Sequence, residues 1–467
     1  MADILKPKVL VVGGGPGGYV AAERCGHLGL DTILVDADRL GGTCLIRGCI
    51  PSKALIHAAS LHAEMRHAAA EPRFGITLPA APVLDLAETV RWKGGVVDRL
   101  NAGVAGLLKR ARVRVLNGHA CFSDARRCTV ATPDGPVIVE AEHVILATGS
   151  VPVALPGLPF GGKVVSSTEA LSPDRLPERL VVVGAGYIGL ELGIAYRKLG
   201  TEVTIVEMAE QILPLYDSAL VEPVKRSLSR LGIDVLLGAR ATGESDDGLI
   251  VETATAERRI LPADRILVTI GRRPAVDGWG LDEMALARNG PFIKVDDHCR
   301  TSSRNVYAIG DVVGEPMLAH KASAQGEMVA RIIAGERRRW DPVAIPAVCF
   351  TDPEIVSVGA APKDVPADIA AITTSFPLKA NGRALTLGGD SDGFVRVVAR
   401  KRDRRILGIQ AVGAHVSELV HQFTTLLEMG AVLEDVAGII HAHPTLGEAL
   451  HEASMTAIDK LTGERAA

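Results

Sequence analysis

The stretch from Lys8 to Gly18 reads Lys-Val-Leu-Val-Val-Gly-Gly-Gly-Pro-Gly-Gly, a short apolar run that ends abruptly in glycines. Such a run predicts a buried strand, and the glycines allow a tight turn into the helix that follows. A second strand, expected over Thr32–Asp36, ends on an acid. The order strand, glycine turn, helix, strand and acid is typical of a dinucleotide-binding unit. The stretch therefore predicts an α/β fold with a parallel sheet.

The same order occurs a second time further along the chain. Leu180–Val183 is the strand, Gly184-Ala-Gly186-Tyr-Ile-Gly189 opens the helix, and the strand Glu202–Glu207 again ends on an acid. In both copies the acid lies 23 residues after the first glycine. The glycines let a pyrophosphate approach the helix N-terminus, and the acid accepts hydrogen bonds from ribose hydroxyls. One motif alone is weak evidence, but two complete copies predict that the chain binds two dinucleotides.

Length and composition limit the possible classes of protein. The 467 residues allow two to four domains, and 47% hydrophobic with 23% charged residues is ordinary for a compact soluble protein. The formal net charge of −4 gives no basic field that would indicate nucleic acid. The N-terminal residues lead into a strand rather than a secretion signal, and no apolar stretch is long enough to span a bilayer. We therefore expect a cytoplasmic protein without a nucleic-acid or membrane partner.

Changes of pattern along the chain predict the domain organisation. We expect a first nucleotide-binding domain over 1–150, a second over 151–275, a central segment that completes the first nucleotide site over 276–345, and a C-terminal domain over 346–467. The Pro-rich stretch 151–159 is interpreted as a linker. The C-terminal part alternates strands with amphipathic helices, which predicts an α+β unit with its own sheet. Further helices are expected over roughly 44–70, 86–111, 417–430 and 433–440, and further strands over 393–399 and 406–412.

Cys44 and Cys49 form a close pair of thiols in the run Gly41-Gly-Thr-Cys-Leu-Ile-Arg-Gly-Cys-Ile-Pro-Ser-Lys53. A disulfide between them would close a very small ring, which loop-entropy models credit with about 2 kcal/mol. A chain of this length buries a large core without such a staple. The pair is therefore interpreted as a redox centre that opens and closes during turnover. The other cysteines are expected to be packed thiols, and no metal site is predicted because no Cys-x-x-Cys occurs.

Together these motifs resemble the dihydrolipoyl dehydrogenases, within the flavin-dependent pyridine nucleotide-disulfide oxidoreductase family. The resemblance covers essentially the whole chain and implies two Rossmann-like domains, for FAD and NAD, with a C-terminal α+β dimerisation domain. It implies a homodimer that oxidises the dihydrolipoamide of a lipoyl domain, from a 2-oxo acid dehydrogenase complex or the glycine cleavage carrier, and reduces NAD. It is carried by both nucleotide folds, the cysteine run, Ala308-Ile-Gly-Asp311, Met317-Leu-Ala-His320 and His441-Ala-His443-Pro-Thr-Leu-Gly-Glu448.

The resemblance assigns FAD to the first nucleotide fold, because the redox cysteines follow it, and NAD to the second. NAD is favoured over NADP, because a 2′-phosphate would meet the like charge of Glu207. The expected NAD site comprises Gly184, Gly186, Gly189, Glu207 and Gly271. The expected FAD site comprises Gly13, Gly15, Gly18, Asp36, Gly42, Thr43, Lys53, Gly118, Thr148, Gly149, Ser150, Asp311, Met317, Leu318 and Ala319.

The two sulfurs receive different roles from the family. Cys49 is expected to face the flavin, and Cys44 is expected to exchange with the substrate. Lys53 lies four residues beyond Cys49, one helical turn along, so both side chains can face the flavin ring. The resemblance suggests that Glu191, just past the second glycine turn, pairs with Lys53.

His443 is expected to be the acid–base, because a dithiol must lose a proton to become a nucleophile and imidazole titrates near the working pH. Glu448, five residues on, is placed to orient the far ring nitrogen. His441 is given a packing or supporting role. In the family this C-terminal histidine faces the cysteines of the other subunit.

Three residues depart from the family pattern or stay open. Arg47 lies between the cysteines where a small apolar residue is usual; it either lowers a thiol pKa, contacts an acidic partner or is simply solvated. Asp36 replaces a commoner glutamate. Tyr187 either covers the flavin or packs. Two rival functions stay open, a glutathione- or mercury-type reductase and a flavoprotein scaffold without disulfide exchange; Glu207 argues against the first, and the intact cysteine and histidine motifs argue against the second.

Overall fold

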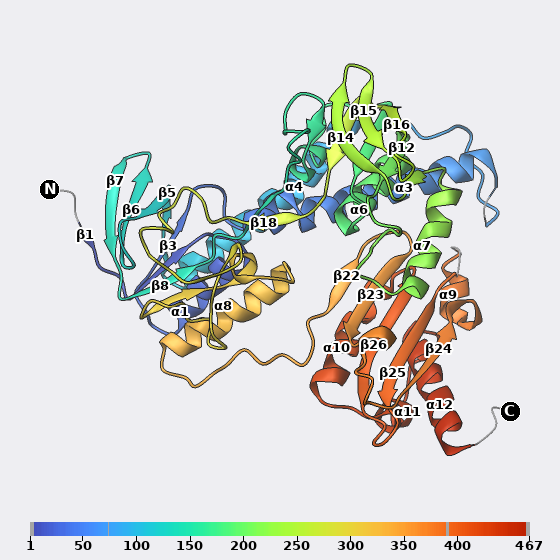
Figure 1. The fold of residues 1–467 in the computed structure, drawn as a ribbon. Coiled ribbons are helices and arrows are strands. Elements are labelled where there is room, and N and C mark those ends of the chain that lie inside the picture. The colour runs from blue at the N-terminus through green and yellow to red at the C-terminus, as the bar shows by residue number, and fades with distance from the viewer. Residues whose placement is uncertain (1–3, 73, 389–391, 464–467) are drawn as a thin grey trace. The chain divides into compact units, whose positions relative to one another are not determined.

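The computed structural model describes residues 4–72, 74–388 and 392–463. The chain forms two compact units (Figure 1). The first comprises 1–155, 165–175 and 270–341, and the second comprises 156–164, 176–269 and 342–467. The first unit therefore gathers the expected first domain with most of the central segment. The second holds the rest of the chain.

A five-stranded parallel sheet organises the first unit. Its strand order is β21-β8-β2-β3-β4, and the two strands of the glycine motif, β2 and β3, are neighbours in register from Val9 with Thr32 to Val12 with Val35. The helix between them, α1 (Pro16–His27), packs along α8 (Ala319–Ile333). The strands are β2 (Val9–Val12), β3 (Thr32–Asp36), β4 (Arg114–Asn117), β8 (His143–Leu146) and β21 (Val306–Ala308).

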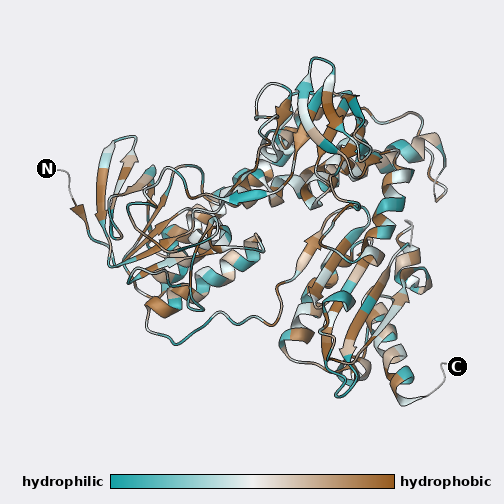
Figure 2. Ribbon diagram, in the orientation of Figure 1, coloured by the Kyte–Doolittle hydropathy of each residue, from teal (hydrophilic) through white to brown (hydrophobic). Residues whose placement is uncertain are grey.

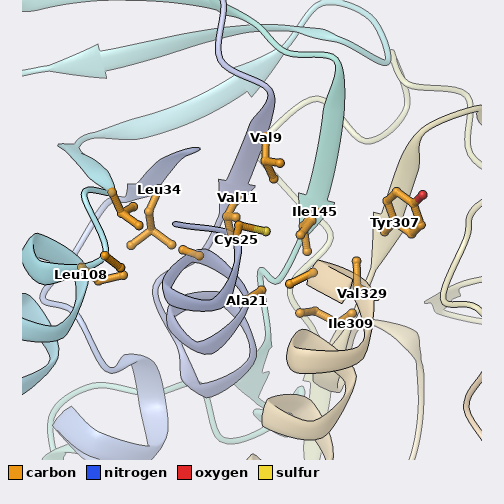
Figure 3. Close-up of a cluster of buried hydrophobic side chains, with 14 of the residues drawn as sticks. Val9, Val11, Ala21, Cys25, Leu34, Leu108, Ile145, Tyr307, Ile309 and Val329 are labelled. Carbon is orange, nitrogen blue, oxygen red and sulfur yellow. The ribbon is translucent and has the colours of Figure 1, made fainter. Parts of the chain in front are cut away.

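The core of this unit lies between the sheet and its helices (Figure 3). Val9 and Val11 on β2 and Ile145 on β8 pack with Ala21 of α1 and Val329 of α8. All five side chains are fully buried, so the glycine turn that follows β2 rests on a closed apolar layer. This layer fixes where the turn presents its backbone.

Smaller sheets complete the first unit. A four-stranded sheet has the order β1-β7-β6-β5, and a two-stranded ribbon pairs β9 with β18. The expected linker at 151–159 therefore begins as a strand, because Ser150 to Pro152 pair with Pro274 to Arg272. The bounds are β1 (Ile4–Leu5), β5 (His119–Phe122), β6 (Arg127–Thr132), β7 (Gly135–Glu140), β9 (Ser150–Pro152), β18 (Arg272–Pro274), β19 (Arg288–Asn289) and β20 (Phe292–Ile293).

One predicted helix is two helices in the structure. Residues 44–70 were expected to be continuous, but α2 (Gly42–Arg47) and α3 (Cys49–Ala70) meet at Gly48, whose φ of −144° and ψ of −114° are not helical. The break places Cys44 and Cys49 on different helices. The expected helix over 86–111 is α4 (Leu86–Arg110), whose first turn is capped by the Asp85 side chain.

The second unit repeats the parallel sheet in the order β10-β17-β11-β12-β13. Its glycine-motif strands are β11 (Arg179–Val183) and β12 (Glu202–Val206), joined by α6 (Tyr187–Leu199). A three-stranded antiparallel sheet, β14-β15-β16, lies within the same part of the chain. The remaining bounds are β10 (Val164–Val165), α7 (Ser218–Arg230), β13 (Asp234–Leu236), β14 (Arg240–Ser245), β15 (Gly248–Glu252), β16 (Arg258–Pro262) and β17 (Arg265–Val268). The short helix α5 (Ser167–Ala170) falls within the first unit.

The C-terminal part of this unit is an antiparallel sheet in the order β22-β23-β26-β25-β24, which confirms the α+β prediction. Hydrophobic residues concentrate on its strands (Figure 2), and α10 and α12 pack against it. The expected helices 417–430 and 433–440 are shorter, and a 3-10 turn precedes the first. The bounds are β22 (Ala347–Cys349), β23 (Glu354–Gly359), β24 (Ala371–Pro377), α9 (Gly382–Thr386), β25 (Phe394–Arg400), β26 (Ile406–Gly413), α10 (Val420–Glu428), α11 (Leu433–Gly438) and α12 (Glu448–Thr462).

Within residues 4–72, 74–388 and 392–463, no helix is both long enough and apolar enough to cross a bilayer.

Candidate active site

The two glycine turns have the same backbone geometry. Gly13 and Gly184 both have a φ of +101°, a conformation that side chains other than hydrogen rarely tolerate. Gly18 and Gly189 lie one helical turn on, and a Cβ at either would collide with the carbonyl oxygen of Gly13 or Gly184. These positions are therefore glycine because the turn and the helix pack on each other.

The second glycine of each Gly-x-Gly-x-x-Gly motif, Gly15 or Gly186, is a glycine for a different reason. A Cβ on Gly186 would meet no described atom within 4 Å, and on Gly15 the nearest atom would be Gly42 Cα at 3.9 Å. Each of these glycines is the N-cap of its helix, and neither helix has an acidic residue in its first turn. An open backbone at an uncompensated helix N-terminus fits a pyrophosphate. The residues present thus fit the pyrophosphate of a dinucleotide at each turn, FAD being the expected ligand of the first turn and NAD of the second.

The acid at the end of each second strand holds its glycine turn in the same way. One oxygen of Glu207 accepts from Ala185 N at 2.7 Å, and the other accepts from Ala209 N at 2.8 Å. Asp36 accepts from Gly14 N and, at 2.8 Å, from Asp38 N. Burial raises the pKa of Asp36, while the Gly14 hydrogen bond opposes the rise. The acids are therefore part of the turns as well as the expected ribose ligands.

The loop after each acid returns to the same turn. Gly41 N donates to Gly14 O at 2.8 Å, and Leu213 N donates to Ala185 O at 2.9 Å. The second residue of each turn, Gly14 or Ala185, is thus held through both its N–H and its carbonyl. In the first copy this loop leads directly into α2 and Cys44, which brings the redox run to the FAD turn.

Cys44, Cys49 and Lys53 are positioned by the break at Gly48. Cys44 lies in α2, while Cys49 is the first residue of α3 and Lys53 follows one turn later. The pKa of the Cys44 thiol is raised, because it shares a hydrogen bond with Cys49 and because it is partly buried, while the Lys53 charge opposes the rise. Thr43 is close to the break, since a Cβ on Gly48 would meet the Thr43 carbonyl oxygen.

Arg47, the unusual residue of the redox run, forms an ion pair with Asp38. Its charge also lowers the pKa of Asp36, against the effect of burial. The charged groups that affect the pKa of Cys44 are Cys49 and Lys53. Among the open readings of Arg47, the structure thus shows a contact within the chain, between the redox helix and the loop after β3.

Asp311 lies in a 3-10 turn after β21, where it accepts from Ser150 Oγ at 2.5 Å. Arg272 holds that serine through two donors, Nε to Ser150 Oγ at 2.8 Å and Nη2 to Ser150 O at 2.7 Å. Arg272 was not among the expected site residues, although it directly follows Gly271, which was. The available signal is its place in Gly271-Arg-Arg-Pro274, which follows an apolar strand as Ala-Thr-Gly-Ser150 does.

The other expected FAD residues lie in the first unit as well. Thr148 Oγ1 donates to Ala275 O at 2.9 Å, Gly149 O accepts from Ala275 N at 2.9 Å, and Gly118 N donates to Asp36 O at 2.8 Å. Met317, Leu318 and Ala319 form the start of α8, with Leu318 as its N-cap. Gly271, expected at the NAD site, has a φ of +125° and accepts from Val153 N.

His443 and Glu448 lie next to each other in the second unit. His443 Nδ1 is 2.9 Å from Glu448 Oε1, and Thr445 N donates to Glu448 Oε2 at 2.8 Å. The hydrogen bond from Thr445 N, and to a smaller extent that with His443, lowers the pKa of Glu448. His441 bonds through Nδ1 to Ile439 O, and its ring contacts that of His451 at 5.0 Å between centroids. The His443 side chain itself is 77% exposed.

Glu191 is 3% exposed in α6, and one carboxylate oxygen accepts from Phe350 N at 2.9 Å. Tyr187 begins the same helix and is 38% exposed. The pairing of Glu191 with Lys53 stays a prediction. Among the remaining cysteines, Cys121 is exposed, which corrects the expectation of a packed thiol, because it points outward from β5.

A dithiol presented at one dinucleotide-binding turn, with a second such turn that carries no thiol, defines a nucleotide-dependent disulfide oxidoreductase. The chain belongs to the pyridine nucleotide-disulphide oxidoreductase family. The family model matches residues 7–326, and the model of the family's dimerisation domain matches residues 345–454.

Curated relatives cover nearly the whole chain. It is 56% identical over 460 residues to the dihydrolipoyl dehydrogenase of Pseudomonas aeruginosa, which spans 98% of this chain and 99% of that protein. It is 43% identical over 461 residues to the dihydrolipoyl dehydrogenase of Geobacillus stearothermophilus, covering 97% of each. The crystal structure of LpdA from Mycobacterium tuberculosis is similar, with a TM-score of 0.87 at 27% identity, covering 97% of this chain and 99% of that one.

Proposed function

We propose that this chain oxidises protein-bound dihydrolipoamide to lipoamide and reduces NAD, with FAD and the Cys44–Cys49 pair as carriers. The observation that carries the proposal is the direct connection of the redox run to the FAD turn. Gly41 is bonded to Gly14, and Gly42 lies against Gly15, two residues before Cys44. The relatives of 43% and 56% identity, both dihydrolipoyl dehydrogenases, support the choice of substrate.

The chain's own residues perform the thiol chemistry. His443 takes a proton from one substrate thiol, and the resulting thiolate attacks Cys44 Sγ of the oxidised pair, which breaks the Cys44–Cys49 bond. The second substrate thiol then attacks the substrate sulfur that is bonded to Cys44. The bond between that sulfur and Cys44 breaks, lipoyl disulfide leaves, and Cys44 takes the proton of the second thiol. Two electrons have moved from the substrate to the cysteine pair. FAD, when bound, accepts such a pair of electrons and makes it available to NAD.

The proton inventory of the pair agrees with this division of roles. The pKa of Cys44 is raised by its hydrogen bond with Cys49, which favours a proton on the sulfur that exchanges with substrate. Glu448 holds His443 Nδ1, which leaves Nε2 as the ring atom to move a proton. Both placements support Cys44 and His443 as partners in one exchange.

The proposal includes a homodimer in which His443 of one copy serves the cysteines of the other. The match to a dimerisation domain over 345–454 supports the dimer. Exposed apolar side chains beside His443, Ile439 at 51% and Ile440 at 97%, support a surface that a second copy covers. The proposed physiological partner is a lipoyl domain, and the proposed domain limits remain 150, 275 and 345.

The test is a steady-state assay with FAD-loaded protein, dihydrolipoamide and NAD. We expect NADH formation and a strong preference for NAD over NADP. A lipoyl domain that carries dihydrolipoamide should serve as a substrate as well. Glutathione disulfide with NADPH is the control for the rival reductase. Reduction of glutathione disulfide without oxidation of dihydrolipoamide would contradict the proposal, and so would a protein that holds FAD but turns over neither substrate.

A further inference from the structure

Tyr216 follows the residue that bonds back to the second glycine turn at the same sequence spacing at which Cys44 of the redox run follows the equivalent residue in the first copy. In the first copy Gly41 N, in the loop after the acid, donates to Gly14 O. In the second copy Leu213 N donates to Ala185 O in the same way. Three residues after Gly41 comes Cys44, and three residues after Leu213 comes Tyr216. The backbone of Leu213 has a φ of +48°, and Tyr216 N donates to Leu213 O at 2.9 Å, so the loop closes tightly on itself.

The Tyr216 hydroxyl accepts from the Cys349 thiol at 3.1 Å. Cys349 is fully buried at the end of β22, and the next residue, Phe350, donates its N–H to Glu191. The contacts therefore form one continuous chain from the NAD loop to α6. We name the four residues Tyr216, Cys349, Phe350 and Glu191 the Tyr216 latch.

The neighbour of Tyr216 is anchored separately. Asp217 caps α7 by accepting from Ala219 N at 3.0 Å, and its carboxylate also receives Arg396 Nη1 at 3.0 Å. The Arg396 and Asp217 side chains are only 8% and 16% exposed, and Gln410 accepts from Arg396 Nε. A buried, multiply bonded pair of this kind holds its geometry well. The tyrosine therefore reaches Cys349 from a fixed base.

We propose that Tyr216 is a positioning residue for Glu191, which it acts on through Cys349 and the Phe350 amide. The proposal rests on the proposed function and on the expected pairing of Glu191 with Lys53 at the flavin. Because Glu191 is almost fully buried, its carboxylate has to be held by the groups around it, and the Phe350 N–H is one of them. When the latch is intact, the 349–350 backbone and the carboxylate keep one arrangement while NAD enters and leaves.

The experiment compares Tyr216→Phe, Cys349→Ala and the double variant with wild type, all as FAD-loaded protein. Tyr196→Phe is the matched control, since it makes the same chemical change on α6 at a residue outside the latch. We expect the first two variants to slow flavin reduction by NADH in a rapid-mixing experiment by about 5-fold, since small misplacements near reacting groups are costly. The double variant should lose no more, because all three remove the same contact.

A second readout follows the latch directly. Amide hydrogen exchange at Phe350 should become about 5-fold faster in Tyr216→Phe and Cys349→Ala and stay unchanged in Tyr196→Phe. Flavin reduction by dihydrolipoamide should slow by a similar factor in both latch variants, because Lys53 and Cys49 are expected to face the same flavin ring, and should stay unchanged in Tyr196→Phe. The proposal is overturned if either Phe350 exchange or flavin reduction by NADH is unchanged in Tyr216→Phe, or if Tyr196→Phe slows flavin reduction as much as Tyr216→Phe does.

These outcomes are separable from those of the proposed function. A wild-type protein that does not oxidise dihydrolipoamide would contradict the proposed function alone. The NADH half-reaction and the Phe350 amide would still decide on the Tyr216 latch.

Discussion

The two glycine turns share the same glycine conformation and equivalent hydrogen bonds, whereas the loops that follow them carry different side chains. Both turns begin with a glycine at a φ of +101°, and both are held by a carboxylate and by one returning N–H. The first loop then leads to Cys44, and the second leads to Tyr216. In the proposed function the shared part binds a dinucleotide, and the loop after the acid supplies the group that differs between the two copies. The following predictions test this division, beginning with the largest effect.

Removal of the substrate-facing sulfur should abolish function on one side of the comparison only. Cys44→Ser is expected to lower lipoamide turnover by about 10³-fold or more, because hydroxyl cannot replace thiolate in disulfide exchange. Flavin reduction by NADH should continue, since the second turn is untouched. Steady-state and rapid-mixing absorbance measure the two reactions. Full lipoamide activity in this variant would show that Cys44 has been misassigned.

Loss of the proposed acid–base should be the next largest effect. His443→Gln is expected to lower dihydrolipoamide oxidation by about 10²-fold, the usual contribution of a positioned general base. His421→Gln, an exposed histidine of α10, is the matched control and should behave as wild type. The assay is NADH formation near neutral pH. Equal losses in the two variants would remove His443 from the mechanism.

A substitution in one glycine turn at a time tests whether each turn binds its own nucleotide. Gly18→Ala and Gly189→Ala each place a methyl group against the first glycine of the turn, and overpacking of this kind costs about 1–3 kcal/mol. We expect Gly18→Ala to weaken FAD retention and Gly189→Ala to weaken NADH binding, each by about 10-fold. Flavin content after dialysis and NADH titration measure these affinities. If either variant weakens both nucleotides equally, the two turns do not serve separate ligands.

The acid of the second turn should affect NAD alone. Glu207→Gln keeps the shape, but its amide has a single acceptor oxygen, so one of the two backbone hydrogen bonds is weakened and the other is lost. KM for NAD is therefore expected to rise about 5-fold and the preference over NADP to fall. Glu202→Gln, exposed at the start of β12, is the control. Unchanged discrimination between NAD and NADP would contradict the ribose role of Glu207.

The Arg47 ion pair should matter least. Arg47 and Asp38 are 37% and 47% exposed, and pairs on a surface contribute little. Arg47→Leu is therefore expected to change FAD retention by about 2-fold at most and to leave Cys44 exchange unaltered. A large loss of thiol reactivity, followed by alkylation of the reduced protein, would show that the arginine acts on the sulfurs instead.

Local patterns predicted most of the fold, because each nucleotide-binding unit is encoded within about 30 residues. The strands at Thr32–Asp36 and the glycine turns follow from nearby residues alone. Gly48 was missed as a helix break, because a single glycine inside a helical pattern is usually tolerated. Tyr216 and Cys349 lie 133 residues apart, and no local signal joins them. Arg272 was missed for the same reason, since Ser150 lies 122 residues before it.

The most direct measurement is an anaerobic titration of the FAD-loaded protein with dihydrolipoamide, followed by addition of NAD. If the dithiol acts through Cys44 and NAD through the second turn, the flavin absorbance falls with dithiol alone and recovers on addition of NAD, with an equivalent amount of NADH formed. A flavin that NADH bleaches but dihydrolipoamide leaves unchanged would contradict the account.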